Sequence, residues 1–547
     1  MSLLDDVSIV VTPNGYKAGT LYGVIPSSGA ADMDVTRATA GTRVDENGLV
    51  NYAEVVSDTE LVTNGDFLTN TSSLWIDWDN LTLPLNSSQQ DGYGILDATT
   101  GTCDARQDIT VEIGKTYLIE ATLKEDVGGS GRLYMSDGAN YSYAFGSFSA
   151  TTTETTFVKY VVPTQTKIRL YAYNSGSAKA YFKNLSVKQA DRDNVPRIDY
   201  TGGGCPHILA EPQRTNTVTY SQDTSQWTDS GMTYSVDYII SPDGTSNGSK
   251  AVINDTITSS NTRPMTSVAV TSGLNYVFSV FGKADEFDMI NLDFSNSAFS
   301  SVSVDYNLTN GTVTSFTGSP VSQGVEDYGN GWYRCYVVAT AIATTNTALI
   351  IRLDDNPTGD GTSGLYLWGA QFEEGSYSTS YIPTSGSTVT RNQDIFTRDG
   401  IGSLINSTEG VLFVEIAALN SGTGSIIISI NDGSLSNSVA IYYYSNENNV
   451  AANIFSGGNN PSLIGTIPNS GTKYDFNKIA LKYKSGDSAL WVNGIEVFTL
   501  GDSISLTGLN KISFDYGNGS FPFYGKVKQL QVFKTALSDS ELAALTS

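Results

Sequence analysis

The chain has 547 residues, which allows about three or four domains of roughly 150 residues, each large enough to bury a core. Hydrophobic residues make up 39% and aromatic residues 11%, which excludes a disordered chain. The formal net charge of −25 argues against nucleic acid as a partner, because so acidic a surface repels phosphates. No apolar run is long enough to span a membrane, so we expect no membrane partner either.

Residues 1–56 are short and mixed in character. A strand-like run from Val7 to Val11 precedes a Pro-Asn-Gly turn, and we interpret the segment as an attachment or assembly region. The start, MSLLDDVSIVVTPNG, has no basic stretch and no long apolar core, so we expect no secretory signal. The three cysteines lie far apart in the sequence, which predicts no disulfide framework.

Residues 57–190 are predicted to form a first β-sandwich. Polar and apolar residues alternate over 116–124, as they do in a strand with one buried face. The residues expected to face the core are Tyr117, Ile119, Ala121 and Leu123. Further strands are expected at 167–173 and 179–188.

Residues 216–383 are predicted to form a second sandwich that repeats the first. Three pairs of segments align: GKTYLIEATLK at 114–124 with GLNYVFSVFGK at 273–283, TKIRLYAY at 166–173 with TALIIRLD at 347–354, and AKAYFKNLSVKQ at 178–189 with SGLYLWGAQFEE at 363–374.

Residues 409–547 are predicted to form a third β unit. Asn493-Gly494 between two apolar runs indicates a two-residue hairpin. Near the end, Ser538 and Glu541 have the spacing of a capping box for a short helix. Residues 191–215 and 384–408 are rich in Gly, Pro, Ser or Thr, and we interpret them as linkers.

Two segments of the third unit, KIALKYKSGDSALWVNGIEVF at 478–498 and FYGKVKQLQVFKTALSDSELAAL at 523–545, resemble laminin-G and concanavalin-like lectin domains. ELVTNGDF at 60–67 and YFKNLSVKQ at 181–189 resemble carbohydrate-binding jelly rolls. The expected fold class is therefore all-β: tandem jelly-roll sandwiches followed by a concanavalin-like sandwich.

Four further segments resemble virion proteins of tailed bacteriophages, namely proteins with a head spike fibre domain and tail fibre proteins. These segments are RATAGTRVDENGLV at 37–50, NVPRIDYTGGGCPHILAEPQRTNTVTYSQD at 194–223, YGNGWYRCYVVATA at 328–341 and GTSGLYLWGAQFEEGSYSTSYIPTSGSTVTR at 361–391. In such proteins the first two run almost directly into each other, so 57–190 is interpreted as an inserted module.

This resemblance implies a structural fibre or spike subunit at the virion surface. Its expected partners are other virion proteins, glycans of the host surface or the environment, and further copies of itself, with a trimer favoured. Attachment to the head or to the tail stays open.

Tryptophan rings can stack on sugars because their broad apolar faces match the C–H faces of the sugar ring. The candidate sugar-binding residues are Trp75, Trp78, Trp227 and Trp491. Core packing is the alternative for all six tryptophans in the chain.

We expect no catalytic residue and no cofactor. The single histidine, His207, lies in a predicted linker, and Asp354-Asp355 and Glu373-Glu374 are adjacent pairs whose members would point to opposite faces of a strand. The alternatives are a polysaccharide-degrading enzyme or a secreted adhesin with accessory carbohydrate-binding modules. The resemblance to jelly rolls also implies a possible structural calcium ion at Asn64 and Asp66.

Overall fold

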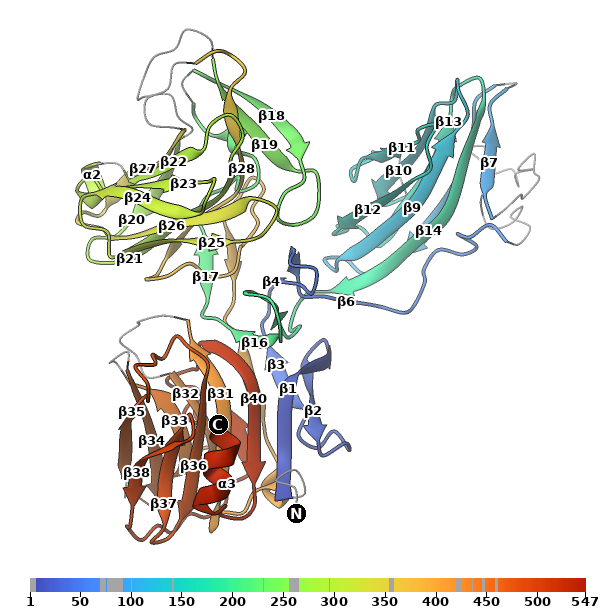
Figure 1. Ribbon diagram of the computed structural model, residues 1–547. Helices are drawn as coiled ribbons and strands as arrows, with labels where there is room; N and C mark the ends of the chain where they lie inside the picture. Colours follow the sequence, from blue (N-terminus) through green and yellow to red (C-terminus); the bar gives the residue numbers. More distant parts are fainter. Residues whose placement is uncertain are drawn as a thin grey trace. The chain divides into compact units, whose positions relative to one another are not determined.

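The computed structural model describes residues 6–68, 75, 92–99, 101–139, 142–229, 231–254, 265–294, 296–353, 359–419, 426–434, 436–444, 448–457 and 461–547. The protein is all-β, as the sequence predicted, and its strands form three β-sandwiches (Figure 1). The chain divides into two compact units, a smaller one of residues 54–192 and a larger one of residues 1–53 and 193–547.

The smaller unit is a sandwich of two antiparallel sheets. Its strands are β6 (Val55–Val56), β7 (Gly94–Asp97), β8 (Cys103–Thr110), β9 (Tyr117–Glu125), β10 (Gly131–Asp137), β11 (Ser147–Ser149), β12 (Thr155–Val161), β13 (Lys167–Asn174) and β14 (Lys179–Asp191). One sheet has the order β11-β10-β13-β8, and the other has the order β12-β9-β14-β6, with β7 also paired to β14.

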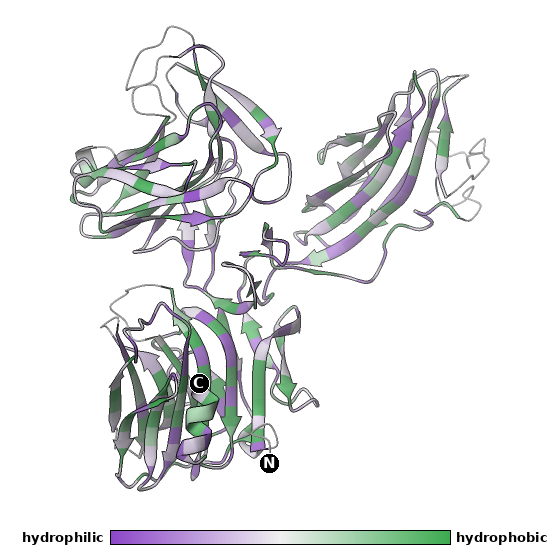
Figure 2. Cartoon of the chain, in the orientation of Figure 1, coloured by the Kyte–Doolittle hydropathy of each residue, from purple (hydrophilic) through white to green (hydrophobic). Residues whose placement is uncertain are grey.

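The core of the smaller unit lies between these two sheets. Tyr117, Ile119, Ala121 and Leu123 of β9 are all buried in it, which confirms the predicted alternation. Figure 2 shows hydrophobic and hydrophilic residues alternating along these strands. The hydrophilic set therefore lies on the outer faces of both sheets.

The second sandwich belongs to the larger unit. Its elements are η1 (Thr224–Gln226), β18 (Met232–Ile239), β19 (Gly248–Ile253), β20 (Met265–Val270), β21 (Asn275–Lys283), β22 (Met289–Phe294), α2 (Asn296–Phe299), β23 (Ser303–Asn307), β24 (Thr312–Thr317), β25 (Ser322–Asp327), β26 (Trp332–Thr340), β27 (Thr345–Leu353) and β28 (Gly364–Glu374). The sheets are β18-β19-β28-β21-β26-β25 and β20-β27-β22-β23-β24.

The repeat seen in the sequence is a repeat of strand pairing. β9 lies between β12 and β14 as β21 lies between β26 and β28, and β13 lies between β8 and β10 as β27 lies between β20 and β22. The aligned Tyr117 and Tyr276 accept a backbone hydrogen bond from Glu112 and Thr271 respectively, each five residues upstream. The two jelly rolls therefore share small details as well as topology.

The third sandwich combines both ends of the chain. From the N-terminal part come β1 (Val7–Lys17), β2 (Thr20–Ile25) and β3 (Met33–Thr36). From the C-terminal part come β30 (Ile395–Arg398), η2 (Gly402–Leu404), β31 (Glu409–Ala418), β32 (Ile426–Asn431), β33 (Asn437–Tyr443), β34 (Asn449–Ser456), β35 (Ser462–Thr466), β36 (Asn477–Lys484), β37 (Ser488–Val492), β38 (Ile495–Leu500), β39 (Lys511–Ser513), β40 (Gly525–Phe533) and α3 (Asp539–Thr546).

The first strands of the chain are therefore part of a domain. β1 pairs with β40, placing Ile9 beside Val532, and β3 pairs with β30, placing Val35 beside Phe396. All four side chains lie in the same core. From the sequence, residues 1–56 were interpreted as an attachment or assembly region. The structure instead builds 7–36 into the third sandwich, because its apolar side chains have a core to enter there.

Two local predictions for the third sandwich are confirmed. Asn493 and Gly494 connect β37 and β38 with φ angles of 47° and 83°, as a two-residue hairpin turn requires. The backbone N–H of Ser538 donates to Glu541 at 2.8 Å, within the capping box that starts α3. The sequence therefore specified these turns locally.

The predicted linkers contain ordered strands. Residues 191–215 include β15 (Ile198–Asp199), β16 (His207–Ala210) and β17 (Arg214–Asn216), and residues 384–408 include β29 (Val389–Arg391) and β30. β17 pairs with β29, and β16 pairs with β40. A short hairpin of β4 (Thr42–Val44) and β5 (Val50–Tyr52) lies in the same unit. The pairings of β16 with β40 and of β17 with β29 are between segments distant in sequence, which is why local periodicity did not reveal them.

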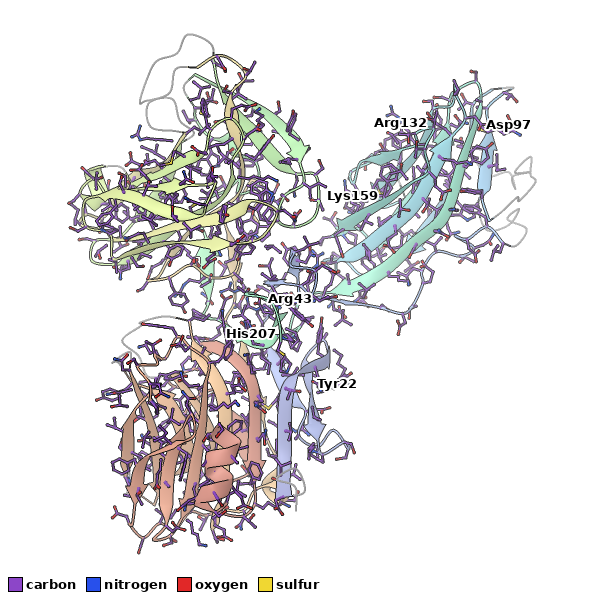
Figure 3. All side chains as sticks on the ribbon, viewed as in Figure 1. Tyr22, Arg43, Asp97, Arg132, Lys159 and His207 are labelled. Atoms are coloured by element: carbon purple, nitrogen blue, oxygen red, sulfur yellow. The ribbon has the colours of Figure 1, made fainter. Side chains whose placement is uncertain are left out.

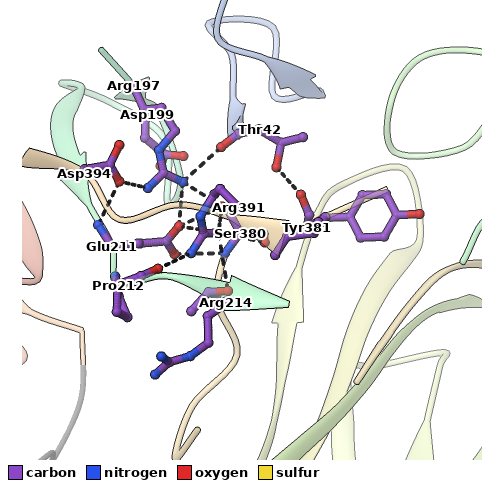
Figure 4. Close-up of polar contacts among 12 residues, drawn as sticks. Thr42, Arg197, Asp199, Glu211, Pro212, Arg214, Ser380, Tyr381, Arg391 and Asp394 are labelled. Atoms are coloured by element: carbon purple, nitrogen blue, oxygen red, sulfur yellow. Dashed lines mark hydrogen bonds and ion pairs between the residues drawn. The ribbon is translucent and has the colours of Figure 1, made fainter. Parts of the chain in front are cut away.

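A buried charge network joins these segments (Figure 4). We use this name for Arg37, Arg197, Glu211, Arg391 and Asp394, whose side chains are at most 4% exposed. Arg37 bonds Asp394 at 2.8 Å, Arg197 bonds both acids, and Arg391 lies 2.9 Å from Glu211. Buried charges persist only when paired. The network therefore fixes the segments from which the second jelly roll extends.

Candidate functional site: a tyrosine face on the smaller unit

The sheet β11-β10-β13-β8 presents tyrosines on its outer surface. In β13, Leu170 and Ala172 enter the core, so Tyr171 and Tyr173 point outward. In β10, Leu133 enters the core and Tyr134 points outward beside Tyr171. The tyrosine face is defined here as Tyr134, Tyr143, Tyr171 and Tyr173 with the outward Asp104, Arg106, Asp108, Arg132 and Arg169.

The four rings of the tyrosine face form one cluster. The rings of Tyr134 and Tyr143 stack, with centroids 4.3 Å apart. Tyr171 lies 6.1 Å from Tyr134 and 5.8 Å from Tyr173, again between ring centroids. Tyr171 is nearly buried, at 4% exposed, whereas the other three are half-buried. The cluster therefore presents partly open ring surface around one enclosed ring.

Cross-strand pairs set the charges of this face in rows. Asp108, Arg169 and Ser136 form one row, and the next row is Arg106, Tyr171 and Tyr134. The Arg169 guanidinium donates two hydrogen bonds to Asp108, at 2.6 and 2.9 Å. Burial would raise the pKa of Asp108, but these bonds and the arginine charge outweigh burial and lower it. This pair is therefore ionised at neutral pH and fixes the first row.

The third row is the open end of the face. It consists of Asp104, Tyr173, Arg132 and Ser149, of which Arg132, labelled in Figure 3, is exposed. Tyr171 donates its hydroxyl hydrogen to Asp104 at 3.2 Å, which links the second row to the third. At the other end, the backbone N–H of Tyr143 donates to the Ser136 hydroxyl at 3.3 Å. This bond places Tyr143 beside the first row.

This arrangement combines flat apolar surface with directional polar groups. Partly open tyrosine rings can lie against the C–H face of a sugar, and the carboxylates and guanidinium groups beside them can bond hydroxyls. Small-ligand sites generally show this mixture of aromatic lining and a few placed polar groups. The tyrosine face is therefore our candidate glycan-binding site.

The opposite sheet of the same unit also carries outward tyrosines, but ammonium groups occupy their faces. The Lys124 ammonium lies over the rings of Tyr93 and Tyr181, 5.4 and 4.9 Å from their centroids. Lys183 lies 4.5 Å from the Tyr93 ring and also pairs with Glu154. A sugar would have to displace these contacts, so this sheet is the weaker candidate.

The larger unit contains a groove of about 570 Å³. Its lining includes Tyr200, Tyr328, Glu326 and the glycine turn 202–204. Asp45, also in the lining, accepts hydrogen bonds from its own hairpin, including two backbone N–H groups at 2.9 Å. The groove therefore presents two tyrosines and acids that are partly in use, which makes it a poorer stacking surface than the tyrosine face.

The tryptophans predicted to bind sugar are enclosed wherever the structure describes them. Trp75, Trp227 and Trp491 are 1%, 6% and 8% exposed, and each lies in a hydrophobic core. A ring so enclosed has no open face for a sugar, so the core-packing alternative describes these three. Trp78 lies outside the described residues. Sugar binding by tryptophan stays a prediction that the structure does not support.

The other residues singled out from sequence are placed as follows. Asp66 is exposed and accepts a hydrogen bond from the Leu68 backbone, and Asn64, with φ of 53°, lies in the same turn. In the described part of the chain, no group of three or more His, Cys, Asp or Glu residues could hold a metal ion. His207 is buried 3.2 Å from Asp199, and Glu373 is buried and accepts from Thr379. Asp354 and Asp355 lie outside the described residues.

Sequence reasoning missed the tyrosine face, although part of its signal was present. In RLYMSD and KIRLYAYN, tyrosine and arginine occupy the positions between core residues, so their outward direction could be read from the period of two. The sequence-based prediction named tryptophans instead of these tyrosines, because tryptophan has the larger stacking surface. Tyr143, on a turn with φ of 47°, had no periodic signal.

No protein-family model and no curated protein matches the chain. Among solved structures, the CBM40 of the Ruminococcus gnavus IT-sialidase is 19% identical, over 27% of this chain and 86% of that one, with a TM-score of 0.24. Domain 4 of AbnA, a GH43 extracellular arabinanase from Geobacillus stearothermophilus, is 17% identical over 28% and 73%, with a TM-score of 0.23. A SAP-like pentraxin from Limulus polyphemus is 14% identical over 26% and 70%, at 0.21.

TM-scores this low identify no relative of the chain, and no residue role is taken from these likenesses. Across the described residues, the helices are all too short or too polar to cross a membrane.

Proposed function

We propose that this chain is a structural, non-catalytic protein that binds glycans through the tyrosine face of residues 54–192. One observation supports this more than any other: four tyrosine rings lie within 6.3 Å of a neighbour on an outward sheet surface, flanked by guanidinium and carboxylate groups. Rings on an outward surface do not contribute to the hydrophobic core. A saccharide, however, can stack on the open ring faces and bond the polar groups beside them.

We further propose that the chain is a fibre or spike subunit on the surface of a tailed-bacteriophage particle, in contact with other virion proteins. The support is the sequence resemblance of 37–50, 194–223, 328–341 and 361–391. In an oligomer, a trimer by that resemblance, several weak tyrosine faces would act together and raise avidity without new contacts.

Glycan binding is tested with the purified full-length chain on a glycan array, followed by calorimetric titration of the strongest hit. The double variant Tyr134→Ala, Tyr173→Ala should weaken binding at least about tenfold, because it removes two half-exposed rings. Tyr181→Ala is the matched control, since it removes a tyrosine from the opposite sheet. Unchanged binding by the double variant, with intact thermal unfolding, would remove the tyrosine face from the proposal.

The particle assignment and the enzymatic alternative need separate experiments. Immunogold labelling of purified phage particles with an antibody to this chain should decorate the head or the tail. Absence of label on particles would favour the secreted adhesin. Incubating the chain with host capsular polysaccharide should leave its size distribution unchanged. Shortened products would favour the polysaccharide-degrading enzyme instead.

A further inference from the structure

Arg132 stands out within the tyrosine face because it is exposed and has uncharged neighbours across both adjacent strands. Its partner on β13 is Tyr173, and its partner on β11 is Ser149. In the described part of the chain, no carboxylate lies within ion-pair distance of its guanidinium. An arginine placed for stability would normally gain an acidic partner, and Arg132 has none there.

Other arginines of the smaller unit show that contrast. Arg169 forms an ion pair with Asp108 at 2.6 Å, and Arg192 forms one with Glu54 at 3.0 Å. Both are at most 13% exposed in their side chains. Arg132 therefore differs in exposure and in partner, at the open end of the face where the rings of Tyr134 and Tyr173 are also accessible.

The charges of the face as a whole leave a cation in excess. Three arginines, Arg106, Arg132 and Arg169, stand against two acids, Asp104 and Asp108, in a chain whose formal net charge is −25. A neutral saccharide does not require a fixed cation, because its hydroxyl groups can also bond to neutral donors. A planar guanidinium matches an anionic oxygen pair with two parallel hydrogen bonds.

We propose that the tyrosine face selects saccharides that carry an anionic group, with the sugar ring against Tyr173 and Tyr134 and the anion on Arg132. This inference rests on the proposed glycan binding and names its ligand class. A carboxylate, as in a uronic acid, is the anion that the guanidinium geometry fits; a sulfate ester presents similar oxygens.

The test uses a glycan array on which uronic-acid oligosaccharides are printed beside their carboxyl-reduced, neutral counterparts and beside sulfated oligosaccharides. The intact chain should bind the uronic acids at least about tenfold more strongly than the reduced forms, and the preference should weaken as salt rises. Arg132→Gln should abolish the preference while leaving the residual binding of the reduced forms.

Lys124→Gln is the matched control. It removes the same charge from the same unit, also beside tyrosine rings but on the opposite sheet, and it should keep the preference. Equal binding of acidic and reduced forms by the intact chain, or an unchanged preference in Arg132→Gln, would overturn this inference and leave glycan binding standing. A preference confined to sulfated sugars would replace the carboxylate by the sulfate. Binding to no arm would overturn both proposals.

Discussion

The two jelly rolls have the same strand pairing but opposite chemistry on the corresponding outer face. By the alignment of β13 with β27, Tyr171 of the first corresponds to Arg352 of the second, and by cross-strand pairing Tyr134 corresponds to Asn291. Arg352 pairs with Asp293 at 2.5 Å, and Asn291 donates to Asp305 at 2.6 Å. Where the first jelly roll has partly open rings, the second has polar side chains paired with carboxylates.

This difference separates what the fold needs from what a ligand needs. Three aligned inward positions are apolar in both copies, Ile168, Leu170 and Ala172 in β13 and Leu349, Ile351 and Leu353 in β27, because both must fill a core. Outward positions are under no such constraint, so their residues report function more directly. The buried charge network lies outside the strands of the second jelly roll, in the segments that precede and follow it in the chain.

The largest expected effect concerns that buried charge network. Asp394→Asn should destabilise the larger unit by about 3–5 kcal/mol, because Arg37 and Arg197 would keep their buried charges without the full counter-charge. In calorimetric unfolding of the full chain, the transition temperature of the larger unit should fall and that of the smaller unit should not change. Asp108→Asn, at a partly exposed pair on the tyrosine face, is the control and should cost about 1 kcal/mol or less. Equal losses in the two variants would contradict the contrast.

A double variant gives the tyrosine face of the first jelly roll the polar residues found at the corresponding positions of the second. Tyr134→Asn with Tyr171→Arg should lower glycan affinity by about 2 kcal/mol, roughly 30-fold. The half-exposed ring of Tyr134 is lost, and the enclosed ring of Tyr171 no longer packs against Tyr143 and Tyr173. Titration of the best array ligand measures this, and Asn291→Ala in the second jelly roll is the matched control that should leave affinity unchanged. If the double variant bound the glycan with unchanged affinity, the difference in outward residues between the two jelly rolls would not determine glycan binding.

Much of this contrast could be read from the sequence. The alternation at 116–124, the repeat and the Asn493-Gly494 hairpin each depend on neighbours within a few residues, and the structure confirms them. The outward direction of Tyr134, Tyr171 and Tyr173 follows from the same period of two. Which outward residues meet across strands depends on register, and register is a long-range property.

The remaining features depend on distant segments. The pairing of β1 with β40 joins residues more than 500 positions apart, as in Ile9 with Val532, and no local pattern indicates it. Likewise, Arg37, Glu211 and Asp394 come from three segments of low periodicity, so no local pattern indicates that their charges meet in a buried network. The burial of Trp75, Trp227 and Trp491 could not be read from the sequence for the same reason: polar sequence neighbours do not reveal what packs from another strand.

Acid should weaken the two parts of the molecule to different extents. Burial alone would raise the pKa values of Glu211 and Asp394, but the surrounding arginines outweigh it, and both pKa values are lowered in the folded state. The unfolded chain then binds more protons as pH falls below about 4, and each carboxylate costs at most about 1.4 kcal/mol of stability per pH unit. As pH falls from 7 to 3, the unfolding temperature of the larger unit should fall. It should fall less steeply with pH in the Asp394→Asn variant. An identical pH slope in that variant would exclude Asp394 as a source.

The smallest expected effect is the loss of stability in Asn184→Ala. Its comparison with Gly369→Ala tests whether the two jelly rolls share the same backbone detail. In each, the strand that pairs with the central one has a bulge, and the aligned residues there are Asn184, with φ of 52°, and Gly369, with φ of 65°. Gly369→Ala should cost about 2 kcal/mol or more, because the added Cβ would lie 2.6 Å from the Phe281 ring and the left-handed backbone would add its own strain. Asn184→Ala should cost about 1 kcal/mol or less, since asparagine already bears a Cβ in that conformation and loses only its local tolerance for it. Urea unfolding midpoints of the two variants give the comparison. A larger loss at Asn184 would mean that the bulge matters more to the first jelly roll than its shared geometry predicts.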